Sequence, residues 1–296
     1  MITADIPDRT IAFQGSPGAY SDLACRRVFP DMTSMPCAAF EDAFAAVRDG
    51  AARLAMIPIE NSVAGRVADI HHLMPDSGLY IIAEHFERVN HHLLALPGAG
   101  IDRIRAVRSH IQALSQCRNF LRSHGLQPVV RADTAGSAAE IKQLGDASVA
   151  AIASELAGEI YGLVSLARNI EDAEHNTTRF VIMSREPVRP PRGAPAVTTF
   201  VFNVRNVPAA LYKALGGFAT NGVNMTKLES YMVGGRFSAT QFYADVEAHP
   251  DDRPLKLALE ELDFFSTEVR ILGVYPAHPL RIAARQQELG QELGED

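Results

Sequence analysis

Short apolar segments alternate with segments of helical periodicity from Thr10 to about Arg185, and this alternation limits the possible folds most strongly. Phe40, Phe44 and Val47 follow the i, i+4, i+7 spacing that places side chains on one face of a helix. Strands that alternate with such helices predict βαβ units and a mostly parallel sheet. Because the elements are short and numerous, we expect an α/β fold with two small lobes. Strands are expected at residues 11–14, 54–59, 79–84, 106–108, 129–132, 149–153 and 179–184.

A proline-rich stretch at residues 186–195, EPVRPPRGAP, separates this part from the rest of the chain. Proline lacks a backbone donor and restricts the residue before it, so the stretch is expected to be a linker. Residues 196–278 then follow the pattern strand, helix, strand, strand, helix, strand, which is the ferredoxin-like βαββαβ order. A hairpin turn is expected at Val233-Gly234-Gly235, and an exposed tail at residues 279–296.

Composition excludes several classes of protein. The chain has 296 residues, 47% of them hydrophobic, which suits about two domains with buried cores rather than a disordered chain. Its net charge of −7 argues against nucleic acid as a partner. No apolar run reaches the roughly 18 residues of a membrane span, and the first residues lack a secretory pattern, so we expect a cytoplasmic protein without membrane contact. Three cysteines without paired spacing favour neither disulfides nor a zinc site.

Three predicted strand-to-helix turns, at residues 15–21, 60–65 and 133–137, carry glycine, hydroxyl or amide residues. Backbone N–H groups at the start of a helix lack helical partners and face the positive end of the dipole, so each turn can bind a carboxylate or phosphate. The same residue types also serve tight turns and N-caps without any ligand. Each turn alone is therefore more often structural, while the three together favour a small anionic ligand. None is a dinucleotide or Walker-type motif.

Other candidate side chains are fewer. His71-His72 and His91-His92 are adjacent pairs whose side chains point apart, so no metal site is expected. Ser109-His110 lacks a third member for a hydrolytic triad, which leaves a ligand-contact role. The segment 176–180, Asn-Thr-Thr-Arg-Phe, places a hydroxyl, a cation and an apolar side chain at the start of a predicted strand. It is a candidate site, although an ordinary strand start explains these residues equally well.

That segment resembles the TRF signature of the prephenate dehydratases. Further segments resemble the same family in the same order along residues 10–280. They are GSPGAYS at 15–21, PIENSVAG at 58–65, SHIQALSQC at 109–117, ADTAGSA at 132–138 and AAIASELAGEIYGL at 150–163. These five motifs and the one at 176–180 follow one another in the order of the family, which makes this resemblance specific.

The resemblance implies a fold and an activity. Residues 8–185 would form a catalytic domain similar to type II periplasmic binding proteins, with the substrate between two lobes. The activity would be that of a lyase, the decarboxylating dehydration of prephenate to phenylpyruvate in phenylalanine biosynthesis. The family uses no cofactor, and the resemblance implies no metal.

The resemblance also assigns site residues. Thr178, Arg179 and Phe180 would be catalytic: Thr178 would donate a hydrogen bond or proton to the leaving hydroxyl, Arg179 would orient a carboxylate, and Phe180 would back the ring. A threonine is too weak an acid to act through its pKa, so its role would be positional. The matched substrate-binding positions are Gly15, Ser16, Gly18, Ser21, Glu60, Asn61, Ser62, Ser109, His110, Thr134, Ala135, Gly136 and Asn176.

Residues 196–278 resemble an ACT regulatory domain through VPAALYKAL at 207–215 and GVNMTKLES at 222–230. This implies feedback inhibition by L-phenylalanine and a homodimer or homotetramer. The implied effector-binding residues are Ala209, Ala210, Leu211, Asn224, Met225, Glu229 and Ser230. Two motifs depart from the family: Pro208-Ala209-Ala210-Leu211 replaces PGAL, and Glu229-Ser230-Tyr231-Met232 replaces ESRP. The identity of the effector is therefore less secure than the catalysis.

Two alternatives stay open at this point. Arogenate differs from prephenate by an amino group in the side chain, and no residue decides between the two substrates. A non-catalytic amino-acid sensor built from a binding-protein fold and an ACT unit is the second alternative. The segment Asn176–Phe180 argues against a sensor, which would not need the hydroxyl.

Overall fold

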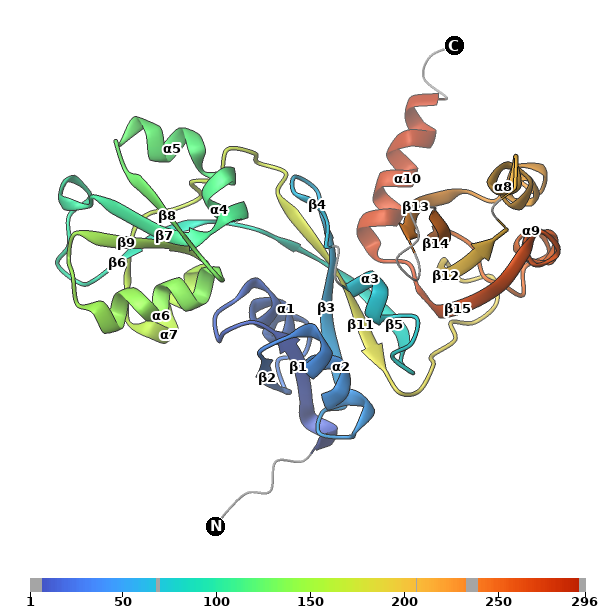
Figure 1. Cartoon of the computed structure of the whole chain (residues 1–296), viewed down its shortest axis with the longest axis horizontal. Coiled ribbons are helices and arrows are strands. Elements are labelled where there is room, and N and C mark those ends of the chain that lie inside the picture. Colours follow the sequence, from blue (N-terminus) through green and yellow to red (C-terminus); the bar gives the residue numbers. More distant parts are fainter. Residues whose placement is uncertain (1–6, 68–69, 206, 233–238, 293–296) are drawn as a thin grey trace. The chain divides into compact units, whose positions relative to one another are not determined.

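The computed structural model describes residues 7–67, 70–205, 207–232 and 239–292 (Figure 1). The chain divides into two compact units, of which unit 1 comprises Met1–Ile70 and His85–Phe180 and unit 2 comprises His71–Glu84 and Val181–Asp296. The proline-rich stretch therefore lies inside unit 2 rather than at the border. The segment His71–Glu84 also belongs to unit 2, which its position in the sequence did not indicate.

The first lobe of unit 1 is built on a sheet in the order β11-β3-β1-β2. Strand β1 (Thr10–Gln14) pairs in parallel with both β2 (Thr33–Cys37) and β3 (Leu54–Asn61). Strand β11 (Thr177–Ser184) lies beside β3, and the short β4 (Gly65–Arg66) pairs with the end of β3. A 3-10 turn (Pro7–Arg9) precedes β1, and helices α1 (Tyr20–Val28) and α2 (Phe40–Arg48) follow β1 and β2.

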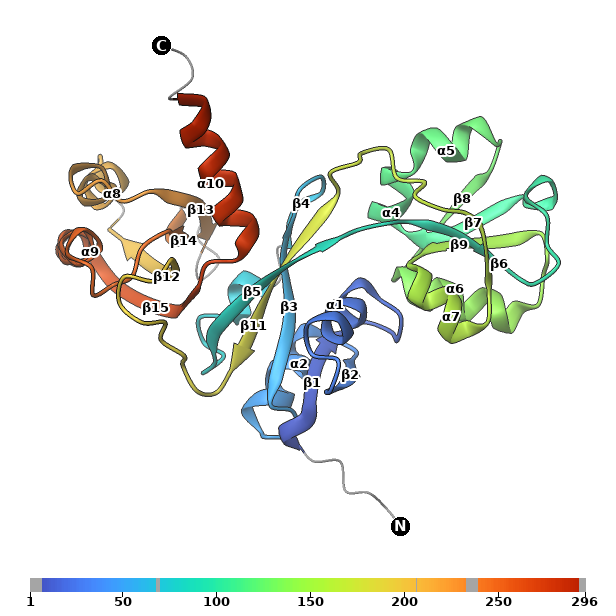
Figure 2. The ribbon, with the colours of Figure 1, turned by 180° about the vertical axis from the view of Figure 1, so that it is seen from behind.

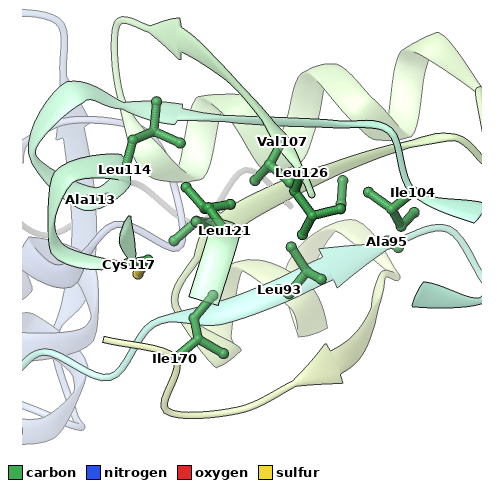
Figure 3. Packing of buried hydrophobic residues seen from close by; sticks show 12 residues of the cluster. Leu93, Ala95, Ile104, Val107, Ala113, Leu114, Cys117, Leu121, Leu126 and Ile170 are labelled. Atoms are coloured by element: carbon green, nitrogen blue, oxygen red, sulfur yellow. The ribbon is translucent and has the colours of Figure 1, made fainter. Parts of the chain in front are cut away.

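The second lobe of unit 1 has its own sheet, in the order β10-β6-β9-β7-β8. These strands are β6 (His92–Ala95), β7 (Ala106–His110), β8 (Gln127–Arg131), β9 (Val149–Ala153) and β10 (Val164–Ala167). The helices are α4 (Ile111–Gln116), α5 (Arg118–Ser123), α6 (Thr134–Leu144), α7 (Glu155–Tyr161) and a 3-10 turn (Ile101–Arg103). Alternation along the strands gives this sheet two apolar faces. Leu93 packs with Leu114 and Leu121 of α4 and α5 (Figure 3), whereas Leu94 packs with Ala135 of α6.

The chain passes between the two lobes twice (Figure 2). One segment joins β5 (Tyr80–Arg88) to β6, and the other joins β10 to β11. The two segments are hydrogen-bonded to each other, since Val89 N donates to the carbonyl of Asn176 at 2.9 Å and Ile170 N donates to that of His91 at 3.0 Å. The expectation of two α/β lobes is confirmed by these two sheets.

Unit 2 contains four antiparallel strands in the order β13-β14-β12-β15. Its elements are β12 (Ala196–Val204), α8 (Ala210–Thr220), β13 (Met225–Met232), β14 (Ala239–Val246), α9 (Arg253–Phe265) and β15 (Ser266–Pro276), which is the βαββαβ order. Phe200 and Phe202 of β12 pack with Ala214, Leu255 and Leu262 of the two helices. The expected hairpin turn Val233-Gly234-Gly235 lies outside the described residues.

Strand β15 pairs in parallel with β5 through Gly273 and Ile81, which explains why His71–Glu84, with helix α3 (Ile70–Leu73) at its start, belongs to unit 2. A Cβ at Gly273 would lie 2.2 Å from the carbonyl oxygen of Ile81, so only glycine permits this approach. Helix α10 (Pro279–Glu292) occupies the segment expected to be a tail, and there Arg281 forms an ion pair with the buried Glu84 at 2.7 Å. In the sequence, the few apolar residues of α10 did not indicate a packed helix, and one of them, Leu280, is indeed exposed in the structure.

The turn at Gly18 connects the two lobes of unit 1 at close range. Its φ is +89°, and a Cβ there would lie 2.7 Å from Cα of Ala157 in α7. Ser154 donates to the Gly18 carbonyl at 2.5 Å, and Tyr161 donates to that of Pro17 at 3.0 Å. The first expected anion-binding turn is therefore also a contact between lobes.

Replacing Gly18 by alanine is expected to lower the free energy of unfolding by about 2–4 kcal/mol, because strain at positive φ adds to an overlap with backbone. Gly125 is the matched control, since its φ is +63° but a Cβ there meets nothing within 4 Å. Gly125→Ala should cost only about 1 kcal/mol. Denaturant unfolding measures both variants, and equal losses would contradict the close contact.

Candidate active site

Three carboxamide side chains form a closed ring of hydrogen bonds in unit 1, which we call the carboxamide ring (Asn61, Gln116 and Asn176). Asn61 Nδ2 donates to Asn176 Oδ1 at 2.8 Å, Asn176 Nδ2 donates to Gln116 Oε1 at 3.0 Å, and Gln116 Nε2 donates to Asn61 Oδ1 at 3.4 Å. The three residues come from the end of β3, the end of α4 and the residue before β11. The ring therefore joins both lobes and the segment that returns between them.

Thr178 lies next to the carboxamide ring. Asn61 Nδ2 donates to Thr178 Oγ1 at 3.0 Å, and the threonine side chain is half-buried in β11. A hydroxyl group has one hydrogen to donate. Within the described ranges, the Thr178 hydroxyl accepts from Asn61 and donates to no protein atom. Its hydrogen is thus available to a ligand.

Ser62 fixes the register of the strand that carries Thr178. Its N–H donates to the Thr177 carbonyl at 2.9 Å, its Oγ donates to that of His175 at 2.7 Å, and the same Oγ accepts from Thr177 N at 3.0 Å. All three bonds are made to the backbone around Thr178. Ser62 thereby holds this segment, and its hydroxyl has no hydrogen left for a ligand.

Arg179 is almost fully buried, with 3% of its side chain exposed, and pairs with Glu60 at 2.9 Å. Successive side chains on a strand point to opposite faces of the sheet. Asn61 meets Thr178 whereas Glu60 meets Arg179, so these two pairs lie on opposite faces. The expected contact of Arg179 with a substrate carboxylate is therefore not supported by this geometry. Phe180 is only 1% exposed and belongs to the core.

In each of the three turns expected to bind an anion, at least one N–H group donates to a side chain of the protein. Gly18 N donates to Asp22 at 2.8 Å, and Gly136 N donates to Asp133, the N-cap of α6. Val63 N and Ala64 N donate to Asn61 Oδ1 at 3.0 and 2.7 Å. For these four groups the expectation of a free anion site is wrong. Sequence patterns could not separate the two cases, because caps and anion sites use the same residue types.

The other expected substrate-binding residues fall into two groups. Ser109 is fully buried and donates to the Ile152 carbonyl at 2.6 Å, and Ser21 and Ala135 are also buried. Half-buried positions are Gly15, Ser16, His110, Thr134 and Gly136. Among these, Ser16 donates to Asp133 at 2.9 Å, and His110 Nδ1 accepts from Gln112 N at the start of α4.

Gln116, His91 and Tyr20 adjoin the site, although sequence reasoning did not assign any of them to substrate binding or catalysis. Gln116 Oε1 lies 2.9 Å from His91 Nε2, and His91 Nδ1 lies 2.8 Å from the Tyr20 hydroxyl. Burial lowers the pKa of His91 and raises that of Tyr20, so both are neutral at pH 7. In the sequence, Gln116 lies inside the motif SHIQALSQC and Tyr20 inside the motif GSPGAYS, but nothing there connects them with His91. A cavity of about 140 Å³ beside the ring is lined by Val63, Ala64, Ser115, Gln116, Asp172, Ala173 and Asn176.

Within the described ranges, no group of three or more His, Cys, Asp or Glu side chains could hold a metal ion. Among those same residues, no helix has the length and apolar character needed to cross a membrane.

Comparisons with known proteins agree with the resemblance. The profile of the prephenate dehydratase family matches residues 11–188. A bifunctional N-acyl-homoserine lactone acylase/prephenate dehydratase from Komagataeibacter europaeus is 56% identical over 275 residues, which cover 93% of this chain and 98% of that protein. The chloroplastic arogenate dehydratase/prephenate dehydratase 1 of Arabidopsis thaliana is 40% identical over 285 residues, covering 92% of this chain and 73% of that protein.

A solved structure extends this likeness to the fold. The prephenate dehydratase of Arthrobacter aurescens, determined in complex with L-Phe, matches with a TM-score of 0.82 at 32% identity and covers 96% of this chain and 99% of that chain. The match of the family profile to more than half of the sequence, together with these relatives, shows that the chain belongs to the prephenate dehydratase family.

Proposed function

We propose that this enzyme converts prephenate to phenylpyruvate, with arogenate as the alternative substrate. The observation that carries the proposal is the Thr178 hydroxyl, which accepts from Asn61 at 3.0 Å and keeps its own hydrogen. It stands in the segment that resembles the TRF signature. A sensor without catalysis would not need such a donor, and the family match argues for an enzyme.

In the proposed reaction two bonds to the substrate ring break. The bond from the ring to its carboxylate breaks, and its electron pair enters the ring as CO2 leaves. The C–O bond on the other side breaks as well, and the hydroxyl group takes up a proton that comes from the solvent and leaves as water. Thr178 assists by hydrogen-bonding to the departing oxygen, while the formation of an aromatic ring drives the reaction. Positioning and a directed hydrogen bond are the contributions required of the protein.

Recognition of the two carboxylates is proposed to depend on neutral donors and on local geometry. Arg179 forms an ion pair with Glu60. We therefore propose that it holds β3 against β11 and does not bind the substrate. His110 Nδ1 accepts a backbone hydrogen bond, so Nε2 is the ring nitrogen that can donate to a ligand. His110 Nε2 and the half-buried Thr134 are the donors we propose for the carboxylates.

Thr178→Ala is expected to lower kcat about 10²- to 10⁴-fold, because the leaving oxygen loses its donor. Thr178→Ser keeps a hydroxyl and should retain a substantial part of the rate. Thr177→Ala is the matched control, since Thr177 is the preceding half-buried residue and accepts from Asn61 Nδ2 through its backbone carbonyl, which the substitution keeps. Formation of phenylpyruvate from prephenate, followed in purified protein, measures all three variants. Near-normal turnover by folded Thr178→Ala would contradict the assignment.

We further propose that residues 196–278 form an ACT regulatory domain that binds L-phenylalanine, in a homodimer or homotetramer. The strand order β13-β14-β12-β15 and the complex of the Arthrobacter aurescens relative with L-Phe support this proposal. Ala209 has a φ of +60°, a conformation that favours glycine, and it stands where the family motif has glycine. The proposed effector residues are Ala209, Ala210, Leu211, Asn224, Met225, Glu229 and Ser230.

L-Phenylalanine is expected to inhibit the wild-type enzyme, and Ala209→Gly should strengthen inhibition, because it removes both a methyl group and the strain at positive φ. The strain destabilises the folded state by about 1 kcal/mol. We therefore expect Ala209→Gly to raise the free energy of unfolding by a similar amount. Titrations of the dehydratase rate with phenylalanine, tyrosine and methionine measure the response. A dehydratase rate that stays unchanged in the presence of each of the three amino acids would contradict the regulatory proposal.

Hydrolysis of N-acyl-homoserine lactones is a second candidate function, favoured by one observation, the 56% identity to the bifunctional protein of Komagataeibacter europaeus. Incubation with an N-acyl-homoserine lactone should then release homoserine lactone and a fatty acid, detected by mass spectrometry. Thr178→Ala separates the two activities if it abolishes only the dehydratase. Intact substrate after prolonged incubation with active dehydratase would rule out this second function.

A further inference from the structure

A second cavity of unit 1 lies away from the carboxamide ring. It has a volume of about 190 Å³, and its walls come from α1, from α7, from the end of β5 and from the start of β6. It shares no lining residue with the cavity beside the ring. Pockets for drug-sized ligands start at roughly 300 Å³, so this cavity suits a smaller molecule. Because α1 and α7 belong to different lobes, both lobes contribute to it.

His92 forms part of the wall and has one unused ring nitrogen. Only 5% of the residue is exposed, and its Nδ1 lies 3.2 Å from Ser165 Oγ. Ser165 donates its hydroxyl hydrogen to the Ala167 carbonyl at 3.1 Å, so its oxygen accepts from His92 Nδ1. His92 Nε2 has no hydrogen-bond partner among the described residues and keeps contact with solvent.

This unused nitrogen is a hydrogen-bond acceptor. Burial lowers the pKa of His92, so the imidazole is neutral at pH 7. A neutral imidazole that donates through Nδ1 has a lone pair at Nε2. Successive residues of an extended chain point to opposite sides, and the preceding His91 contacts Gln116 of the carboxamide ring. His92 therefore offers its lone pair to the cavity and not to the candidate active site.

Two glutamates of α7 add negative charge to the cavity wall. Glu155 pairs with Arg168 at 3.1 Å. The Glu159 carboxylate has no partner in the part of the chain that the structure describes. Glu159 and His92 Nε2 both accept hydrogen bonds. A primary ammonium group matches them, because it has three donors and a positive charge.

Two arginines of the wall have donors to spare. Arg27 pairs with the buried Glu87, and Arg88 donates to Asn90 at 3.1 Å and to Glu171 at 3.4 Å. A guanidinium group has five N–H donors, so each arginine keeps donors that these contacts do not use. Guanidinium groups bind carboxylates through pairs of parallel hydrogen bonds. The cavity thus has groups for a carboxylate as well as for an ammonium group.

We propose that this cavity binds a free α-amino acid with a small apolar side chain. The ammonium group donates to His92 Nε2 beside the glutamates of α7, and the carboxylate accepts from the arginines. Leu23 and Leu156 line the cavity and provide apolar contacts for the side chain. The bound amino acid contacts both lobes of unit 1. The site is separate from the proposed effector residues, which belong to unit 2, and it does not depend on the proposed dehydratase activity.

L-Leucine and two analogues test the chemical class of the ligand. Isothermal titration calorimetry of the full chain should show binding of L-leucine or of the smaller L-valine. Isopentylamine lacks only the carboxylate of leucine, and 4-methylpentanoate lacks only its amino group. Each analogue should bind about tenfold more weakly than leucine, because a charged hydrogen-bonding group is lost. An analogue that binds as tightly as leucine would overturn the proposal, as would the absence of binding of both amino acids at about 10 mM.

Two variants locate the bound amino acid. His92→Asn keeps a donor for Ser165 but removes the acceptor Nε2, so it should weaken the binding of leucine about tenfold. Glu159→Gln removes an exposed charge and should weaken it about threefold. Glu41→Gln is the matched control, since Glu41 is equally exposed on a helix, α2, and lies outside the cavity. It should bind leucine as the wild type does.

Thermal unfolding shows whether each variant is folded, and Glu159→Gln alters only an exposed side chain, so it tests the site even if His92→Asn does not fold. Leucine binding that stays at the wild-type affinity in folded Glu159→Gln and His92→Asn would place the amino acid elsewhere on the chain and overturn the proposal.

Discussion

The hydrogen bond from Asn61 Nδ2 to Thr178 Oγ1, 3.0 Å long, is the interaction on which the site depends. Its direction makes the threonine an acceptor inside the protein and leaves it a donor toward the ligand. Rigid backbone groups set this direction, because the N–H groups of Val63 and Ala64 both donate to Asn61 Oδ1 and so fix the orientation of the Asn61 amide. Helix α4, strand β3 and the segment before β11 must all be in place for the ring to close. The carboxamide ring therefore depends on both lobes and on the connection between them.

Electrostatics in this protein are arranged locally. The chain carries a net charge of −7, yet the proposed substrate has two carboxylates. At two turns that could have held an anion, Gly18 N donates to Asp22 and Gly136 N donates to Asp133, and the buried Arg179 is paired with Glu60. The substrate therefore cannot be held by a general positive field. Neutral donors with fixed directions, such as the Thr178 hydroxyl, suit a reaction in which charge moves from a carboxylate to a leaving oxygen.

Sequence reasoning predicted those parts of the fold that depend on local pattern. The strand expected at 149–153 coincides with β9, because every residue there is apolar and buried. Strand β2, with the sequence TSMPC, was missed because it is polar and partly exposed, so it has no apolar run to mark it. The place of His71–Glu84 in unit 2 follows from the pairing of Gly273 with Ile81, a contact between residues far apart in the sequence. The same distinction applies to the site. Thr178 was found through its short motif, whereas His91, Gln116 and Tyr20 meet only in the folded chain.

Neutron diffraction from a deuterated crystal tests the central claim most directly, because it locates the deuterium atoms of Asn61 and Thr178. The account predicts a deuterium bonded to Asn61 Nδ2 and pointing at Thr178 Oγ1, with the threonine's own deuterium turned toward the open side of the site. A Thr178 deuterium that points at the oxygen of Asn61 would contradict the account.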